Sequence, residues 1–282
     1  QLLAAQVAEA LQRTHTREVW EFGAGTGALA LQVLDELAAL GVRPDRYTIV
    51  DLSGTLRARQ QLRLVKYEGL VHWADALPER LEGVVIVNEV LDAMPVQLLV
   101  RKAGVWHERG VVLQPDGSLG WEDRPTQLRP PMEIEGEHDY LTEIHLQGEA
   151  FIRTLGERMA RGAAFFIDYG FGESEYFHPQ RHMGTLVCHR LHKVDDDPLA
   201  EVGLKDITAH VNFSGIAEAA VDAGLTVAGF ASQARFLMNA GITELLMTLD
   251  PNDPRSFLPA SNAVQKLLSE AEMGELFKVI AL

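Results

Sequence analysis

Short apolar runs alternate with helical patterns along the first hundred residues, and this alternation constrains the fold more than any other feature of the chain. Apolar, β-branched runs predict strands, and apolar residues at helical spacing predict the helices between them. In chain order, these are a strand at 19–22, a helix at 28–40, a strand at 47–50, a helix at 53–64 and a strand at 83–87. Such an order predicts an α/β fold, with a mostly parallel sheet and helices on both of its faces.

The pattern changes after Pro95, which indicates an insertion into this sheet. The later predicted elements are antiparallel strands at 96–101 and 105–113, a helix at 147–160, a strand at 163–169, a helix at 213–224, and strands at 225–230 and 277–280. We expect one domain over 1–282, with an insertion at 96–145 after the fourth strand. A long substrate-side segment with short helices is expected at 170–212, after the fifth strand. Since Gln1 already lies in an amphipathic helical pattern, we expect the natural N-terminus to lie upstream.

The charge balance argues against nucleic acid as a partner. The chain has 25 basic and 40 acidic residues, and its net charge of −15 has the wrong sign for attraction to a polyanion but suits a cationic partner. No apolar stretch reaches the length of about 18 residues that a spanning helix needs, so we expect no membrane insertion. Cys188 is the single cysteine, which favours a reducing compartment: the cytoplasm of a bacterium, or the mitochondrial matrix of a eukaryote.

A glycine-rich turn with the sequence EFGAGTG, at 21–27, separates the first predicted strand from the first helix. Glycines let the backbone adopt positive φ and approach a ligand, while the N–H groups of the helix start point into the same space. We therefore predict a bound ligand at this turn. Gly23, Gly25 and Ala28 satisfy the dinucleotide pattern G-x-G-x-x-G/A, and Asp51 follows the turn by roughly 20 residues, where a ribose-binding acid is expected. The glycines alone therefore leave an NAD-dependent oxidoreductase open.

Two further features favour a methyl donor over a dinucleotide. Glu21 lies two residues before the first glycine, and Gly27 adds a third glycine. The run resembles motif I of class I S-adenosylmethionine-dependent methyltransferases, whose ligand carries a sulfonium and an ammonium group. A carboxylate suits those cations and is unfavourable beside a pyrophosphate. Asp51, at the end of the second strand, is then expected to accept both ribose hydroxyls.

The ends of the following strands supply the other cofactor candidates. Leu52 follows the ribose-binding acid, and Asp75 and Ala76 lie in a segment that we expect to border the adenine. Asp75 could accept from the exocyclic amine of the adenine, or it could cap a surface turn. Asn88 ends the fourth strand, at the edge where open α/β sheets keep their sites.

The sequence NEVLDAMP at 88–95 carries two acids that follow this strand. Glu89 and Asp92 are three residues apart, so in a helical turn they would share a face and could clamp a cation. The alternative is an ordinary helix start, where acids are favoured by the helix dipole.

Six segments carry a family resemblance: 21–27, 49–53 (IVDLS), 88–95, 166–170 (FIDYG), 184–186 (GTL) and 206–211 (DITAHV). Together they resemble the MidA-like family of class I methyltransferases. The resemblance implies a Rossmann-like sheet of seven strands and S-adenosyl-L-methionine as the cofactor. Mitochondrial members are protein arginine methyltransferases that assist the assembly of respiratory complex I, so it also implies a protein substrate with a target arginine. The family pattern includes an upstream segment, with Gly-Asp-Phe and Ser-Pro, that this chain lacks.

Methyl transfer to a guanidine nitrogen suggests which residues are catalytic. The reaction is an in-line displacement, helped mainly by holding donor and acceptor at near-attack distance. Carboxylates that pair with a guanidinium can localise its charge and orient the attacking nitrogen. We expect Glu89 and Asp92 to do this, with Glu143 as a third candidate and Tyr169 lining the pocket.

Other interpretations stay open on the sequence alone. An NAD-dependent oxidoreductase explains Gly23, Gly25 and Asp51 but leaves Glu21 and the 88–95 segment unexplained. A non-catalytic assembly factor could bind the cofactor only for structure. The edge strand near the C-terminus could support a homodimer, although nothing in the sequence requires one.

Several histidines crowd one region: His178, His182, His189, His192 and His210. A second cysteine and a His-Glu-x-x-His motif are both missing from the sequence. We therefore expect no metal site and interpret these side chains as solvated or hydrogen-bonded histidines beside a substrate groove.

Overall fold

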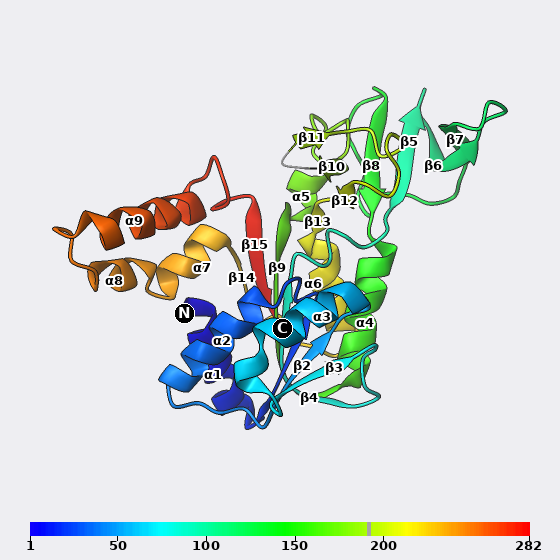
Figure 1. The fold of residues 1–282 in the computed structure, drawn as a ribbon. Helices are drawn as coiled ribbons and strands as arrows, with labels where there is room; N and C mark the ends of the chain where they lie inside the picture. Colours follow the sequence, from blue (N-terminus) through cyan, green and yellow to red (C-terminus); the bar gives the residue numbers. More distant parts are fainter. Residues whose placement is uncertain (191–192) are drawn as a thin grey trace. The chain divides into compact units, whose positions relative to one another are not determined.

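The computed structural model describes residues 1–190 and 193–282 (Figure 1). They divide into two compact units. The sheet unit consists of Gln1–Val90, Thr154–Asp168 and Ala223–Leu282, and the inserted unit of Leu91–Arg153 and Tyr169–Asp222. Most of the inserted unit comes from the two stretches, 96–145 and 170–212, that the sequence marks as additions to the sheet.

The sheet unit is built on a mostly parallel sheet with the strand order β14-β15-β9-β4-β1-β2-β3. Its strands are β1 (Glu18–Phe22), β2 (Arg46–Val50), β3 (Val71–Ala74), β4 (Leu81–Asn88), β9 (Met159–Phe171), β14 (Gly229–Ser232) and β15 (Phe277–Ala281). β1 pairs in parallel with β2 and β4, and β14 pairs antiparallel with β15. The seven strands of this path confirm the predicted α/β class.

Helices surround these strands as the alternating pattern predicts. They are α1 (Leu2–Thr14), α2 (Ala28–Ala39), α3 (Gly54–Arg63), the short η1 (Val65–Tyr67), α4 (Leu146–Arg158), α7 (Gln233–Asn239), α8 (Ile242–Met247) and α9 (Pro254–Leu268). α1 contacts α2 and β4, while α7, α8 and α9 contact one another (Figure 1). α4 and β9 each contribute residues to both units.

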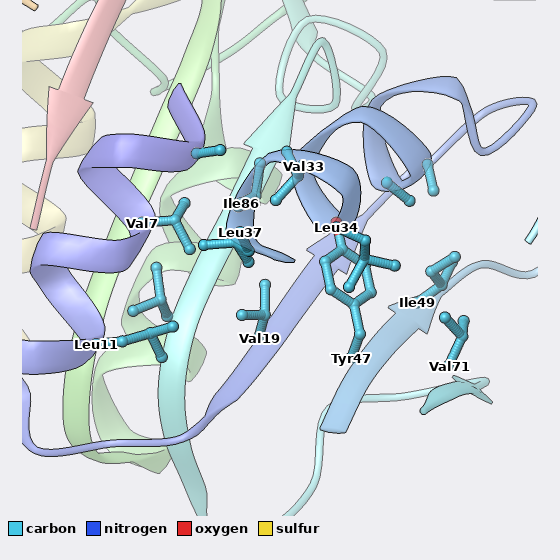
Figure 2. Close-up of a cluster of buried hydrophobic side chains, with 14 of the residues drawn as sticks. Val7, Leu11, Val19, Val33, Leu34, Leu37, Tyr47, Ile49, Val71 and Ile86 are labelled. Carbon is cyan, nitrogen blue, oxygen red and sulfur yellow. The ribbon is translucent and has the colours of Figure 1, made fainter. Parts of the chain in front are cut away.

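One hydrophobic core joins α1 and α2 to the sheet (Figure 2). Ten of its members are at most 5% exposed: Val7, Leu11, Val19, Val33, Leu34, Leu37, Tyr47, Ile49, Val71 and Ile86. In α1 and α2 these side chains recur three or four residues apart, which places them on one face of each helix. Burying each such aliphatic side chain stabilises the fold by about 1.5–3 kcal/mol.

The inserted unit contains two further sheets. An antiparallel sheet has the order β7-β6-β5-β8, with β5 (Gln97–Lys102), β6 (Val105–Leu113), β7 (Leu119–Pro125) and β8 (Tyr140–Ile144). The hairpin between β5 and β6 turns through Ala103 and Gly104, whose φ values of +46° and +78° match the twist of the strands. A smaller sheet joins β11 (Lys193–Asp195), β10 (Val187–Arg190) and β12 (Asp206–Thr208).

The remaining elements of the inserted unit are α5 (Glu173–Tyr176), β13 (Val211–Asn212) and α6 (Phe213–Asp222). Two expectations differ from the structure. The polar stretch after β6 contains strand β7, and the segment at 170–212 carries the small sheet besides a short helix. Both sets of strands are largely exposed, so they lack the alternation of buried and exposed residues that marks a half-buried strand. Within the described residues, every helix is too short or too polar to cross a membrane.

Candidate cofactor and active site

The loop between β1 and α2 carries three glycines with positive φ: +61° at Gly23, +51° at Gly25 and +77° at Gly27. A Cβ at Gly23 would lie 2.7 Å from Cγ2 of Val90, so crowding requires glycine there. A Cβ at Gly25 would meet nothing within 4 Å. The backbone at Gly25 therefore faces open space at the start of a helix, which suits the close approach of a ligand.

Gln60 ties this loop to the ribose-binding candidate. Its Nε2 donates to the carbonyl oxygen of Gly25 (2.9 Å) and to Oδ2 of Asp51 (2.7 Å), and its Oε1 accepts from Nε1 of Trp73 (2.9 Å). Asp51 also accepts from the N–H of Ser53 (2.9 Å), which caps α3. Each carboxylate oxygen has two lone pairs, so Asp51 can still accept ribose hydroxyls. The residues present therefore fit a nucleoside group.

Sequence reasoning missed Gln60 because its three partners lie on segments far away along the chain. Gln60 is the buried residue of α3, and it is 0% exposed. The available signal was a polar side chain on the inner face of an otherwise polar helix. Because buried amide groups need hydrogen-bond partners, a glutamine on this face predicts hydrogen bonds to neighbouring segments.

Glu21 is buried beside Tyr47. It is 2% exposed, and its Oε2 accepts from the hydroxyl of Tyr47 (2.6 Å). Burial raises the pKa of Glu21 to about 7, although the hydrogen bond from Tyr47 acts in the opposite direction. The structure thus buries this carboxyl group at the end of β1, directly before the glycine loop, in a setting where its charge is costly.

The adenine-side candidates lie at the surface. Leu52 is 85% exposed, which is unusual for a leucine beside a buried strand end, and Ala76 is exposed. Asp75 forms an ion pair with Arg57, whose Nη2 also donates to the carbonyl oxygen of Asp51 (3.1 Å). In this conformation the exposed carboxylate of Asp75 is therefore engaged by Arg57.

The backbone turns sharply after β4. Glu89 has a φ of +50°, which residues other than glycine seldom adopt. Its N–H donates to the carbonyl oxygen of Ile167 (2.9 Å), and the N–H of Val90 donates to Oδ2 of Asp168 (3.2 Å). Nδ2 of Asn88 donates to Oε1 of Glu89 (3.1 Å), whose side chain is exposed. Strained backbone that is held in this way is common at functional sites.

The segment after Glu89 does not form the expected helical turn. The positive φ of Glu89 breaks the helical path, and a turn closes with a hydrogen bond from the N–H of Met94 to the carbonyl oxygen of Leu91 (3.2 Å). The spacing argument that put Glu89 and Asp92 on one helical face is therefore wrong. Asp92 belongs to the inserted unit, is 4% exposed, and accepts the N–H of Ala209 (2.9 Å) with its backbone carbonyl.

Glu143 is 0% exposed and surrounded by donors. It accepts from the N–H (2.9 Å) and the hydroxyl (3.0 Å) of Thr185, the N–H of Leu186 (3.2 Å) and the hydroxyl of Tyr176 (3.1 Å). Burial raises the pKa of Glu143, and the hydrogen bonds from Thr185 oppose that rise. A Cβ at Gly184 would collide with this carboxylate. In this conformation Glu143 organises the 184–186 segment and is out of reach of a substrate.

Tyr169 lies in an aromatic cluster within the inserted unit. Its ring centroid is 6.1 Å from that of His210, which stacks on Phe171 at 5.3 Å. The guanidinium of Arg181 lies 3.9 Å from the centroid of Phe171. Tyr169 is partly exposed, so it can line a pocket, and aromatic faces of this kind attract guanidinium groups.

The histidines show no metal-binding arrangement in the part of the chain that the structure describes, where no three His, Cys, Asp or Glu side chains are grouped to hold an ion. Nδ1 of His178 accepts from the N–H of Gln180 (3.2 Å), and Nδ1 of His182 lies 3.2 Å from the carbonyl oxygen of Gln180. His192 lies outside the described residues.

The strand order and the glycine loop define a class I methyltransferase-like α/β protein. Residues 2–231 match the model of a family described as "Putative S-adenosyl-L-methionine-dependent methyltransferase". The chain belongs to this family, which confirms the resemblance inferred from its motifs. The cofactor of the family is S-adenosyl-L-methionine, as the sequence predicts, and the nicotinamide alternative finds no support.

Relatives with established names share about a quarter to a third of their aligned residues with the chain. A mitochondrial protein arginine methyltransferase, NDUFAF7 of Danio rerio, is 27% identical over 217 residues, which cover 74% of this chain and 49% of the relative. The homologue of Drosophila melanogaster is 30% identical over 213 residues, which cover 71% of this chain and 47% of the relative. The chain thus spans about half the length of these two relatives.

One protein of known structure is considerably more similar to the chain than these mitochondrial relatives are. A Burkholderia thailandensis protein, crystallised with S-adenosyl-homocysteine bound, is 56% identical to the chain. The superposition has a TM-score of 0.93 and covers 99% of this chain and 74% of that one.

Proposed function

We propose that the protein transfers the methyl group of S-adenosyl-L-methionine to an arginine side chain of a protein. The observation that carries the proposal is the assembly of glycine loop, Gln60 and Asp51, which offers open space over Gly25 beside a carboxylate suited to a ribose. Family membership supports the cofactor and the reaction class. The names of the mitochondrial relatives support arginine as the acceptor.

The cofactor would be held by residues of the sheet unit. Asp51 accepts the ribose hydroxyls, and Glu21 balances the positive charge of the cofactor from below the loop. Leu52, with 85% of its surface exposed, covers the adenine with apolar surface. Asn88 fixes the turn through its hydrogen bond to Glu89.

The bound cofactor supplies an electrophilic methyl group on a sulfonium. Glu89 and Asp92 pair with the target guanidinium, localise its charge and orient one nitrogen for in-line attack. The carboxylate of Glu89, which is exposed at the end of β4, is the acceptor for the proton that this nitrogen loses. Tyr169 contacts the guanidinium through its ring, and Glu143 positions the 184–186 segment.

The negative charge of the chain suits a basic protein substrate. In a eukaryote the site of action would be the mitochondrial matrix, in keeping with the mitochondrial names of the relatives, and in a bacterium the cytoplasm.

A transfer assay tests the proposal. Wild-type protein, S-adenosyl-L-methionine with a tritiated methyl group, and a protein extract should give label that elutes as methylarginine after acid hydrolysis. Glu89→Gln and Asp92→Asn should each lower the rate tenfold to a hundredfold, since a hydrogen bond to a charged group contributes about 1.5–3 kcal/mol.

Glu79→Gln and Glu137→Gln, at exposed positions of the two units, are the matched controls and should keep the wild-type rate. Label on another residue type would disprove arginine as the acceptor. Cofactor binding without any labelled protein would favour the non-catalytic assembly factor instead.

A further inference from the structure

An open groove of about 480 Å³ lies within the inserted unit. One wall is formed by β6 and β7, from which Val111, Leu119 and Trp121 line it while remaining 51%, 38% and 38% exposed. The other wall is the loop between β11 and β12, which contributes Leu199 and Val202. Val202 is 60% exposed. Two facing sets of apolar side chains that stay in water mark a binding surface.

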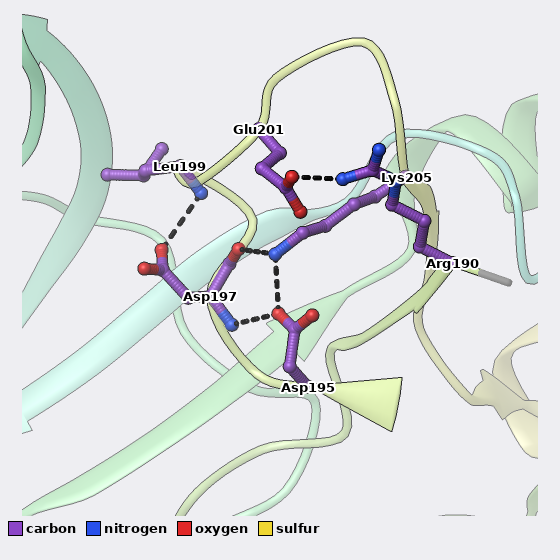
Figure 3. Close-up of polar contacts among 6 residues, drawn as sticks. All are labelled: Arg190, Asp195, Asp197, Leu199, Glu201 and Lys205. Atoms are coloured by element: carbon purple, nitrogen blue, oxygen red, sulfur yellow. Dashed lines mark hydrogen bonds and ion pairs between the residues drawn. The ribbon is translucent and has the colours of Figure 1, made fainter. Parts of the chain in front are cut away.

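A polar network holds the loop that forms the second wall (Figure 3). Nζ of Lys205 donates to Oδ1 of Asp195 (2.7 Å) and to the carbonyl oxygen of Asp197 (2.9 Å). The carboxylate of Asp197 accepts the N–H of Leu199 (3.0 Å), and Glu201 pairs with Arg190. The loop therefore has a defined shape, and its apolar side chains reach solvent although exposing them is unfavourable.

The charges around the groove favour a basic occupant. Between 193 and 206 the chain has five acidic and two basic side chains. Since Lys205 pairs with Asp195 and Arg190 with Glu201, the acidic excess comes from Asp196, Asp197 and Asp206 against Lys193. Arg109 lines the opposite wall, but Asp123 neutralises it through two hydrogen bonds of 2.7 and 2.9 Å. Asp92 adds an acid to the lining of the groove. An apolar surface with acidic borders is complementary to a peptide that carries both leucine-like and basic side chains.

We propose that this groove binds the apolar side chains that flank the target arginine of the protein substrate. The inference rests on the proposed function, because it is Asp92, the proposed partner of the target guanidinium, that lines the same groove as Trp121 and Val202. The substrate class is thereby narrowed to basic segments that have apolar residues close to the arginine.

Two synthetic peptides of equal charge test the proposal: Leu-Lys-Leu-Gly-Arg-Gly-Leu-Lys-Leu and the same sequence with serine at every leucine, each labelled with fluorescein. The leucine peptide should bind the wild-type chain at least tenfold more tightly in fluorescence anisotropy, as expected when one leucine-sized side chain is buried at about 1.5 kcal/mol. Val202→Asp and Val111→Asp should reduce this preference to about twofold or less.

Val194→Asp and Val105→Asp are the matched controls, because these valines lie on β11 and β6, are 65% and 55% exposed, and are not part of the groove. They should keep the preference, and all four variants should retain the thermal midpoint of the wild type within a few degrees. Equal binding of the two peptides by the wild type, or the same loss in the controls, overturns the proposal. A dimer in sedimentation that Val202→Asp dissociates would also overturn it, since a second copy would then fill the groove.

Methyl transfer to the two peptides separates this inference from the function on which it rests. If both are methylated with equal kcat/KM, the function stands and the groove assignment fails. If the leucine peptide binds in the groove but neither peptide nor extract is methylated, the groove binds peptides and the proposed function fails.

Discussion

Glu21 is a carboxyl group whose protonation should depend on the cofactor. Its burial raises its pKa to about 7, so near neutrality a large fraction of the apo protein carries the proton. A cation placed beside it favours the carboxylate and lowers this pKa. The proposed contact between Glu21 and the positive charge of the cofactor therefore couples ligand binding to proton release.

Titration with S-adenosyl-homocysteine, which keeps the ammonium group, should release a proton from the wild type near pH 6 and less above pH 8, since Glu21 is then already ionised. Calorimetry in buffers of different ionisation enthalpy measures this release. Glu21→Gln should bind without it. Equal release by Glu21→Gln and wild type would assign the proton to another group.

Helix α3 connects the glycine loop to β2 and β3 through one side chain. Gln60 satisfies Gly25, Asp51 and Trp73 at once, so its loss leaves buried polar groups unpaired at about 1–3 kcal/mol each. Gln60→Leu should weaken S-adenosyl-homocysteine binding by about tenfold or more and lower the thermal midpoint. Gln61→Leu, at the exposed neighbouring position, should change neither. Equal affinities of the two variants would remove Gln60 from the cofactor site.

The elements themselves were largely predictable, because strands β1, β2 and β4 and helices α2 and α3 follow from local apolar spacing. Gly23 and Asp51 were predictable for the same reason, as they sit at the ends of such elements. The partners of Gln60 and Asp168 were not, since these contacts join segments that are distant in sequence. The left-handed backbone of Glu89 was also hidden, because its hydrogen bond to Ile167 comes from another strand.

Across the whole molecule, the candidate residues divide between the two units. Glu21, Asp51 and the other cofactor candidates lie in the sheet unit, whereas Asp92, Glu143 and Tyr169 lie in the inserted unit. Each unit also buries ionisable groups whose titration affects stability. Glu21 in the sheet unit and His145, which is 3% exposed and lies with Glu143 in the inserted unit, have pKa shifts of opposite direction.

These two groups should give stability opposite dependences on pH. The pKa of Glu21 is raised from 4.5 to about 7, so the folded state binds more protons than the unfolded state and stability falls as pH rises across that window. Burial lowers the pKa of His145 from 6.5 to about 4, so stability falls as pH drops across that window. Each shift is about 2.5 pKa units and corresponds to about 3.5 kcal/mol at about 1.4 kcal/mol per pKa unit.

Denaturant titrations from pH 4.5 to 6.5 check this expectation. Relative to wild type, Glu21→Gln should make stability rise more steeply with pH, and His145→Gln should make it fall with pH. His72→Gln, at an exposed position, should keep the wild-type profile. Parallel profiles for all four proteins would contradict the assigned linkage.

Calorimetric titration of the chain with S-adenosyl-homocysteine and, separately, with NADH tests the central claim most directly, because that claim assigns the glycine loop, Gln60 and Asp51 to a methyl-donor cofactor. We predict micromolar binding of S-adenosyl-homocysteine that Gln60→Leu weakens and Gln61→Leu does not, and no binding of NADH. Binding of NADH without S-adenosyl-homocysteine would contradict the account and make Asp51 a ribose ligand of a nicotinamide cofactor.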